Sequence, residues 1–313
     1  MKVLHISKYY PPEPGGIENF VHDLAVAQLA HGHDVRVMAH QFEFAKKTGC
    51  ERLQGVNVLR IRSYGQLSYA PVTPEFPLQL QSVLLQFKPD VIHAHLPNTS
   101  VFWLLFLKKA TPLILHWHSD VVPSVVDRKM AFLYRFYQPL ERRLLQRASR
   151  VIATSRAYLM SSRVLRPFRD KSTVIPLGID AARLKTKTGN GKAGISSAAF
   201  SVLSVGRFAY YKGYEYLLQA ARRLPDVNFS IVGDGPRYKA IEAQVAQLGL
   251  KDRVKLLGKV NQGRLGALFA ECDVFCMPSI ERTEAFGMAL LEAMSMGKPL
   301  ITSAIQGSGM TEV

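Results

Sequence analysis

Residues 273–304 read DVFCMPSIERTEAFGMALLEAMSMGKPLITSA, and this stretch decides the fold class. An apolar run, DVFCMPS, precedes a loop, a helical pattern from about Phe286 to Met296, and a second apolar run, PLITSA. Two short apolar runs on either side of a helix are typical of parallel strands joined by a crossover. The stretch therefore predicts one strand–helix–strand unit of a parallel sheet.

The same alternation extends along the whole chain. Further apolar runs are KVLHIS, DVRVMA, VNVLRIR, DVIHAH, LILHWH, RVIATS, FSVLSVGR, FSIVGDG and VKLLGKV, most of them separated by helical patterns. At 313 residues the chain is longer than one hydrophobic core usually serves. The stretch ARLKTKTGNGKAGISSA is polar without periodicity and indicates a linker or surface loop. We predict an α/β protein of two doubly wound Rossmann-like domains, residues 1–175 and 176–313, facing across a cleft.

Charge and composition narrow the partners and the compartment. Forty Lys and Arg against 24 Asp and Glu give a net charge of +16, which indicates a polyanionic partner: phosphate groups, anionic lipid or nucleic acid. Three cysteines are a poor disulfide framework and suit a reducing compartment. The start, MKVLHISKYY, resembles a strand more than a signal peptide, and VFWLLFL is shorter than the roughly 20 residues of a membrane span. We expect a cytoplasmic protein.

One glycine pattern is misleading. Gly189, Gly191 and Gly194 satisfy the G-x-G-x-x-G spacing. A dinucleotide fingerprint requires a strand before it and a helix after it, whereas KTKT precedes this one and ISSAA follows. We therefore interpret it as part of the linker.

Ligands of parallel sheets bind beyond the carboxyl ends of the strands, where this chain carries several candidates. Arg207 and Lys212 follow FSVLSV, and two cations there suit a diphosphate; the alternative is a solvated basic loop. Gly15 and Gly16 precede a helix whose first N–H groups favour anions, or they form an ordinary tight turn. Gly233 shapes either a turn under a nucleotide or a turn alone.

Glu284 and Glu292 flank AFGMALL and are the strongest candidates. Glu284 lies in the loop before the helix, and Glu292 lies two turns within it. If the segment is helical throughout, eight positions rise roughly 12 Å. That exceeds the roughly 5–10 Å of a glycosidase acid–base pair, so two contacts along one extended ligand fit better. The alternative is a pair of solvated carboxylates favoured by the helix dipole.

Taken in order, these segments resemble the retaining glycosyltransferases of the GT-B fold, family 4 type, which include envelope and O-antigen mannosyltransferases. The matching segments are PPEPGGIE, DVIHAH, LILHWHSD, VIATS, VIPLGID, LSVGRFAYYKG, IVGDGP, VKLLGKV, DVFCMPS and EAFGMALLEAMSMGKPLI. The resemblance covers about Lys2 to Ile301, and its Glu-x7-Glu segment is highly specific.

The resemblance implies a role for each matching position. Arg207 and Lys212 would bind the donor diphosphate, Glu292 the ribose, and Glu284 the hydroxyls of the transferred sugar. His118 would lie beside the reacting sugar from the opposite domain, with Glu284 as the other catalytic residue. The remaining donor-binding positions are Gly15, Gly16, Gly233 and the backbone of Phe286, Gly287 and Met288. The family requires no metal or other cofactor, since the cations replace Mg²⁺, and the leaving phosphate accepts the proton of the acceptor.

Two departures from the family pattern concern the C-terminal end. The last donor loop reads QGSGMTEV instead of Gly-Gly followed shortly by Pro-Glu, so Gly309, Met310 and Thr311 are uncertain donor contacts. A similar departure in O-antigen mannosyltransferases favours GDP-mannose as donor, with a UDP-sugar next. Family members also continue beyond the position of Val313, so a second domain truncated at its C-terminus is expected.

Histidines and one basic helix leave alternatives open. The pairs His93/His95 and His116/His118 could bind zinc, but no Cys or carboxylate completes a ligand set. His118 is the donor-site candidate, and the others are expected in the core or lining the cleft. KMAFLYRFYQPLERRLLQRASR is either a core helix with a basic back or a helix that docks on anionic lipid, and Pro139 should kink or end it.

Three functions remain open at this point. The first is transfer of a hexose from a nucleotide diphosphate sugar to a glycan or a polyprenyl or other lipid-linked acceptor in envelope polysaccharide synthesis, at the inner face of the plasma membrane. The second is a non-catalytic nucleotide-binding remnant. The third is a basic nucleic-acid-binding protein, although no recognised binding module is present and nucleic acid is not an expected partner.

Overall fold

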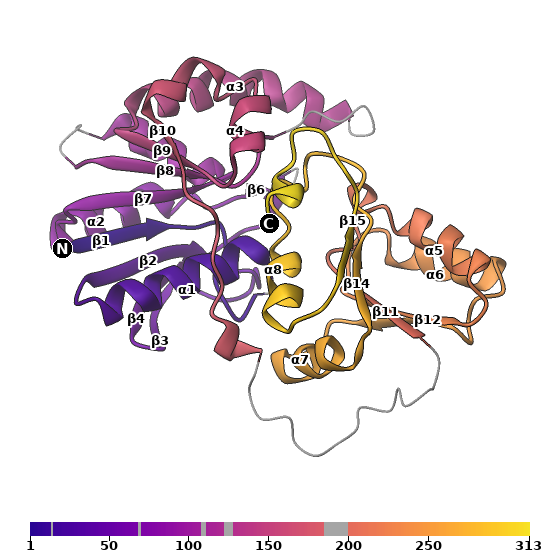
Figure 1. The fold of residues 1–313 in the computed structure, drawn as a ribbon. Coiled ribbons are helices and arrows are strands. Elements are labelled where there is room, and N and C mark those ends of the chain that lie inside the picture. Colours follow the sequence, from indigo (N-terminus) through magenta and orange to yellow (C-terminus); the bar gives the residue numbers. More distant parts are fainter. Residues whose placement is uncertain (14, 68–69, 108–110, 122–127, 185–199) are drawn as a thin grey trace. The chain divides into compact units, whose positions relative to one another are not determined.

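The computed structural model of the 313-residue chain describes all residues except 14, 68–69, 108–110, 122–127 and 185–199 (Figure 1). The chain forms two compact units, Met1–Leu177 and Gly178–Val313. The G-x-G-x-x-G pattern of the linker lies outside the described residues.

An eight-stranded sheet forms the centre of the N-terminal unit. Its strand order is β10-β9-β8-β7-β1-β2-β4-β3, and every pairing is parallel except that of β3 with β4. The strands are β1 (Lys2–Ile6), β2 (Asp34–His40), β3 (Gly49–Leu53), β4 (Val56–Ile61), β7 (Val91–Leu96), β8 (Leu113–Trp117), β9 (Arg150–Ala153) and β10 (Ser172–Val174), with a two-stranded ribbon of β5 (Gln66–Leu67) and β6 (Ala70–Pro71). The direction in which successive strands are added reverses between β1 and β7.

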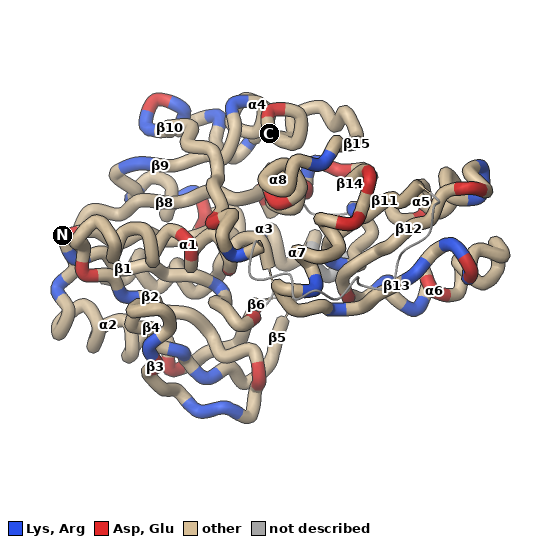
Figure 2. The backbone as a smooth tube through the Cα atoms, turned by 60° about the horizontal axis from the view of Figure 1, so that its bottom comes forward, with Lys and Arg blue, Asp and Glu red and all other residues tan. Residues whose placement is uncertain are grey.

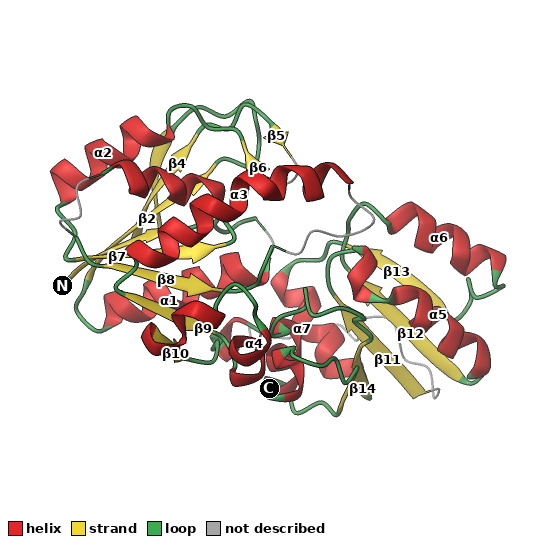
Figure 3. Cartoon of the chain, turned by 90° about the horizontal axis from the view of Figure 1, so that it is seen from above, coloured by secondary structure: helices red, strands yellow, loops and turns green. Residues whose placement is uncertain are grey.

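Helices cover both faces of this sheet. Helix α1 (Gly16–Ala30) lies on one face, and α2 (Phe76–Phe87) and α3 (Arg128–Arg147) lie on the other (Figure 3). The shorter elements are α4 (Arg156–Ser161) and the 3₁₀ segments η1 (Thr99–Phe106) and η2 (Arg166–Lys171). Of the two effects predicted for Pro139, a kink or an end of the helix, the second does not occur, because α3 continues through this residue. A proline within a helix removes one backbone hydrogen bond and crowds the preceding turn, yet α3 extends over 20 residues around it.

The C-terminal unit has a five-stranded, all-parallel sheet in the order β13-β12-β11-β14-β15. Its strands are β11 (Phe200–Val205), β12 (Val227–Val232), β13 (Val254–Gly258), β14 (Val274–Met277) and β15 (Leu300–Thr302), and its helices are α5 (Tyr214–Arg223), α6 (Tyr238–Gln247), α7 (Gln262–Glu271) and α8 (Met288–Ser295), with the 3₁₀ turns η3 (Ala181–Arg183), η4 (Tyr210–Lys212) and η5 (Gly309–Thr311). The strand order reverses between β11 and β14. The α/β fold class predicted from the sequence is confirmed.

Neighbouring strand residues of this unit enter two different cores, as side chains alternate along a strand. Val202 and Val274 pack with α5 and α6, whereas Leu203 and Phe275 pack with α7 and α8. The apolar runs without alternation in the sequence therefore reflect burial on both faces.

The cysteines occupy different elements. Cys272 directly follows α7, and Cys276 lies in β14. All three are free thiols, and burial raises the pKa of Cys272 and of Cys276 to about 11. These two behave as small apolar side chains.

Charge is spread through both units. Lys and Arg occur along the backbone of each unit (Figure 2). No helix in the described part of the chain combines the length and the apolar character needed to cross a bilayer.

Candidate functional site

The loops after β11 and β14 meet at the point where the C-terminal sheet reverses its strand order. Gly213 ends the first loop with φ 65°, and a Cβ atom on it would lie 2.2 Å from the carbonyl oxygen of Pro278 in the second. The amide of Ile280 donates to the carbonyl of Tyr211 at 2.8 Å, and the Tyr210 hydroxyl bonds the Glu281 carboxylate. Sheets of this type bind ligands at this position, because adjacent loops diverge there.

A buried ion pair joins these two loops. Lys212 Nζ contacts Glu284 Oε2, and Lys212 is only 8% exposed. The Ser279 hydroxyl lies 3.3 Å from the same carboxylate oxygen. Burial acts to lower the pKa of Lys212, but the Glu284 charge and the hydroxyls of Tyr211 and Tyr214 outweigh it, so the pKa is raised above its ordinary value. Lys212 is therefore a fixed cation at neutral pH.

Arg207 lies on the same loop as Lys212 and is exposed. The loop is held against the one after β12: the Phe208 amide donates to the Asp234 carbonyl at 3.0 Å. Gly233 has φ 137°, and a Cβ atom there would lie 1.9 Å from the Gly206 carbonyl oxygen. Gly233 is thus required for close backbone packing.

Helix α8 begins with open backbone donors. Gly287, at φ 87°, precedes it without a side-chain cap, while Phe286 is buried. The first N–H groups of a helix have no intrahelical partner and favour anions, so the backbone from Phe286 to Met288 offers such donors. Since α8 starts at Met288, Glu292 lies only one turn within it, and the prediction of two turns is wrong.

Glu292 has a partner that the sequence did not reveal. Its Oε1 lies 3.2 Å from Nη2 of Arg183, and Glu292 is 7% exposed. Arg183 belongs to η3 and lies 109 positions before Glu292 in the chain. The prediction of a solvated carboxylate at this position is therefore excluded, and Arg183 joins the candidate site.

The loop after β15 is held by hydrogen bonds to the backbone carbonyls of Glu284 and the residue after it. Ser308 Oγ donates to the Glu284 carbonyl, and the Gly309 amide donates to that of Ala285 at 2.7 Å. Met310 is 3% exposed and packs in the core with α7 and α8, and Thr311 is exposed. Met310 acts as a core residue here.

The remaining predicted residues belong to the N-terminal unit. Gly15 precedes α1, and Gly16 is the first residue of α1. A Cβ atom on Gly15 would lie 2.0 Å from a carboxylate oxygen of Glu18. His118 follows β8 directly and is 4% exposed. In this unit the strand order reverses beside β1, and the loop that follows β1 contains Gly15 and leads to Gly16, where α1 begins.

Comparison with known proteins identifies the family. The family described as Glycosyltransferase Family 4 matches residues 14–183, and Glycosyl transferases group 1 matches residues 190–313. The chain belongs to glycosyltransferase family 4. It is 32% identical to the O-antigen chain mannosyltransferase C of Escherichia coli over 99% of this chain and 81% of that one. It is 33% identical to the D-rhamnosyltransferase WbpZ of Pseudomonas aeruginosa over 100% and 80%.

The solved structures give the same fold. Sucrose-phosphate synthase from Thermosynechococcus elongatus superposes with a TM-score of 0.77 at 23% identity, covering 98% of this chain and 82% of that one. This family 4 glycosyltransferase has the GT-B architecture of two Rossmann-like domains.

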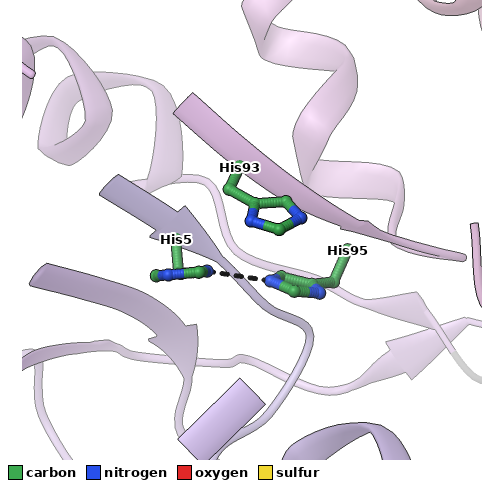
Figure 4. Close-up of side chains that lie close together, drawn as sticks. All are labelled: His5, His93 and His95. Atoms are coloured by element: carbon green, nitrogen blue, oxygen red, sulfur yellow. Dashed lines mark hydrogen bonds between the residues drawn. The ribbon is translucent and has the colours of Figure 1, made fainter. Parts of the chain in front are cut away.

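Five buried histidines of this glycosyltransferase form one cluster on the α1 face of the N-terminal sheet. The four in the H-x-H pairs were among the predicted residues, but His5 of β1, which lies in register with His93 of β7, was not. Figure 4 shows His5 and His95 joined by a hydrogen bond, with His93 beside them. His5 joins the cluster because β1 and β7 are neighbouring strands in the sheet, and no pattern around His5 in the sequence indicates this. Nitrogens of His5, His93 and His95, and those of His95, His116 and His118, lie within 4.8 Å of one another, although no carboxylate or thiolate joins either group among the described residues.

A buried carboxyl group lies on the opposite side of this sheet. Glu141 of α3 is 1% exposed, its Oε2 lies 3.5 Å from the Tyr134 hydroxyl, and its Oε1 has no hydrogen-bond partner among the described residues. Burial, with a smaller contribution from the Asp120 charge, raises the pKa of Glu141 to about 8. Glu141 is therefore largely protonated at pH 7.

Replacing Glu141 by Gln should stabilise this glycosyltransferase in alkaline solution. A raised carboxyl pKa gives stability that is present below the unfolded pKa of 4.5 and lost as the pH rises through about 8. We expect the Glu141→Gln protein to melt at the wild-type temperature at pH 5 and a few degrees higher at pH 8.5. Glu43→Gln, at an exposed carboxylate, is the control. Equal melting temperatures at pH 8.5 would contradict the raised pKa.

Proposed function

We propose that this glycosyltransferase transfers a hexose, with retention of configuration and without a metal, from a nucleotide diphosphate sugar to a glycan or lipid-linked acceptor of envelope polysaccharide. GDP-mannose is the favoured donor and a UDP-sugar the next. The relatives named as an O-antigen mannosyltransferase and a rhamnosyltransferase support the envelope pathway.

The buried Lys212–Glu284 pair is the observation that carries the proposal. A pair of opposite charges at the reversal point of a sheet offers both a cation for phosphate oxygens and a carboxylate for sugar hydroxyls. With Arg207 on the same loop and the open N-terminus of α8, the C-terminal unit supplies positive charge where a departing diphosphate becomes more negative. Such an arrangement replaces a divalent cation, because it neutralises the leaving group directly.

The acceptor side of the proposal includes a membrane surface. Phe132 and Phe136 of α3 are 60% and 64% exposed, and η1, which packs on α3, exposes Trp103 and Phe106. Exposed Arg135, Arg142 and Arg143 lie on the same helix. Exposed aromatic and basic side chains together favour an interface with anionic lipid, and this would place the enzyme at the inner face of the plasma membrane.

Thermal-shift measurements with GDP-mannose, UDP-glucose and UDP-N-acetylglucosamine test the donor proposal. A ligand that binds only the folded state at 100 times its Kd stabilises by about 2.7 kcal/mol, which raises the melting temperature by several degrees. We expect the largest shift with GDP-mannose and its loss in Arg207→Ala and in Lys212→Ala. A full shift in both variants would contradict the phosphate assignment, and binding without sugar transfer would favour the non-catalytic remnant.

A further inference from the structure

The five clustered histidines are arranged in two rows of imidazole rings. In the first row, His5 Nδ1 lies 3.0 Å from His95 Nε2, and His95 Nδ1 lies 3.1 Å from His118 Nε2. The ring centroids are 5.3 and 5.4 Å apart, as expected for rings that meet edge to edge. In the second row, His93 Nε2 lies 3.3 Å from His116 Nδ1. Each row is therefore linked by hydrogen bonds in the ring planes.

The two rows stack face to face. His116 and His118 have centroids 4.4 Å apart and planes within 2° of each other, and His93 lies 4.6 Å from His95. Phe20 of α1 packs edge-on against His95, His116 and His118. Packing on all sides leaves the rings little freedom to rotate or flip.

One end of the first row is fixed by an amide group. His5 Nε2 lies 2.7 Å from Gln28 Oε1, at the last turn of α1. An amide oxygen only accepts, so His5 Nε2 must carry the hydrogen. A neutral imidazole has a single N–H, and burial lowers the pKa of His5 to about 4 and that of His118 to about 3, with His95 well below its usual value. All three rings are therefore neutral at pH 7.

The tautomers then follow along the row. Because His5 Nε2 donates, His5 Nδ1 is bare and accepts from His95 Nε2. His95 Nδ1 is bare in turn and accepts from His118 Nε2. The row ends at His118 Nδ1, a bare nitrogen that is buried and has no hydrogen-bond partner in the described ranges of the chain. A buried acceptor without a donor is uncommon in native structures and requires an explanation.

We infer that Gln28, His5 and His95 act as positioning residues that fix the tautomer of His118, so that its Nδ1 accepts a hydrogen bond from a hydroxyl of the transferred sugar. The last step rests on the proposed function, whereas the tautomer assignment does not. A hydroxyl supplies the donor that Nδ1 lacks, and the opposite tautomer would present an N–H there instead. Among the described residues no side-chain amide bonds His93 or His116, so the second row serves as an internal reference.

Nitrogen-15 NMR of the full chain with labelled imidazoles tests the tautomers. We expect His5, His95 and His118 as pure Nε2–H tautomers at pH 7.5, with His118 assigned by the loss of its signals in His118→Asn. Gln28→Met should give mixed tautomers along the first row and leave His93 and His116 unchanged. Gln28→Glu should keep the wild-type pattern, because a carboxylate accepts the same bond. Gln54→Met is the matched control, since Gln54 accepts from His22 outside the cluster.

Transfer kinetics test the link to the sugar. Gln28→Met should lower kcat/KM by about three- to tenfold, with an unchanged Kd for the nucleoside diphosphate, and Gln28→Glu should restore the rate. An Nδ1–H tautomer of His118 in the wild-type protein overturns the inference whatever the activity, and so does a Gln28→Met spectrum identical to the wild type. If the tautomers are as expected but neither the wild type nor any variant transfers sugar, the proposed function is wrong. The assignment of the His5, His95 and His118 tautomers would then still hold.

Discussion

Replacing Lys212 by Met is expected to lower kcat/KM by about 10²–10³-fold, the usual loss when one preorganised charge-stabilising group is removed. Lys212 is the buried cation of the site, and its raised pKa keeps it charged throughout the physiological range. A methionine keeps the apolar part of the side chain and removes the charge. Steady-state transfer from the nucleotide sugar identified by thermal shift gives the measurement.

A single Lys212 variant is not sufficient, because it leaves the Glu284 carboxylate buried without its partner. Breaking a buried ion pair from one side destabilises by about 3–5 kcal/mol. The double variant Lys212→Met/Glu284→Gln removes both charges, and we expect it to melt close to the wild type while remaining inactive. Lys259→Ala, at a 58% exposed lysine after β13, is the control and should be fully active. Near wild-type transfer by the stable double variant would remove Lys212 and Glu284 from the mechanism.

Lowering the pH from 7 to 5 is expected to destabilise the N-terminal unit by several kcal/mol. Burial lowers the pKa of six of its histidines, with further contributions from neighbouring charges: His5, His40, His93, His95, His116 and His118. A histidine with a lowered folded pKa binds its proton more readily when unfolded. Stability therefore falls as the pH decreases below the unfolded value of 6.5, and continues to fall until the folded pKa, about 4 for His5, is reached.

The expected loss of stability is large because the contributions of the six histidines add. Each such histidine contributes up to about 2 kcal/mol between pH 7 and 5, against a typical domain stability of about 5–15 kcal/mol. Glu141 acts in the opposite direction, but it is a single group. Acid unfolding of this unit near pH 5 is the expected outcome.

The C-terminal unit provides the internal control for this experiment. All nine histidines of the chain lie between His5 and His118, so residues 178–313 contain none. Hydrogen exchange at pH 5 and 7, corrected for intrinsic rates, should show loss of protection in β1, β7 and β8 and unchanged protection in β11 and β12. Equal pH dependence in both units would show that the buried histidines are not neutral in the folded state.

Much of the architecture could be predicted because it depends on local pattern. The apolar runs DVFCMPS and PLITSA with a helix between them required a parallel crossover, and β14, α8 and β15 occupy those positions. Lys212 was predicted from its place after a strand and Glu284 from its place in the loop before a helix, and the structure joins them in one ion pair. Their roles in binding and transfer remain predictions.

Hydrogen bonds and ion pairs between distant residues could not be predicted from the sequence, because no local pattern indicates which residue will be the partner. Arg183 pairs with Glu292 across 109 positions, and Gln28 bonds His5 across 23. The first contact joins the 3₁₀ turn η3 to helix α8, and the second joins helix α1 to strand β1, so the packing of these elements decides both.

The sequence by itself determined the fold class, the family and the residue types at the strand ends. These features depend on residues close together in the chain, through strand and helix periodicity and through short motifs. Only the tertiary structure decided which side chains meet. The Lys212–Glu284 pair and the row from Gln28 to His118 both depend on strands that are adjacent in space and distant in the chain, and burial in that packed arrangement sets their charge and hydrogen bonding.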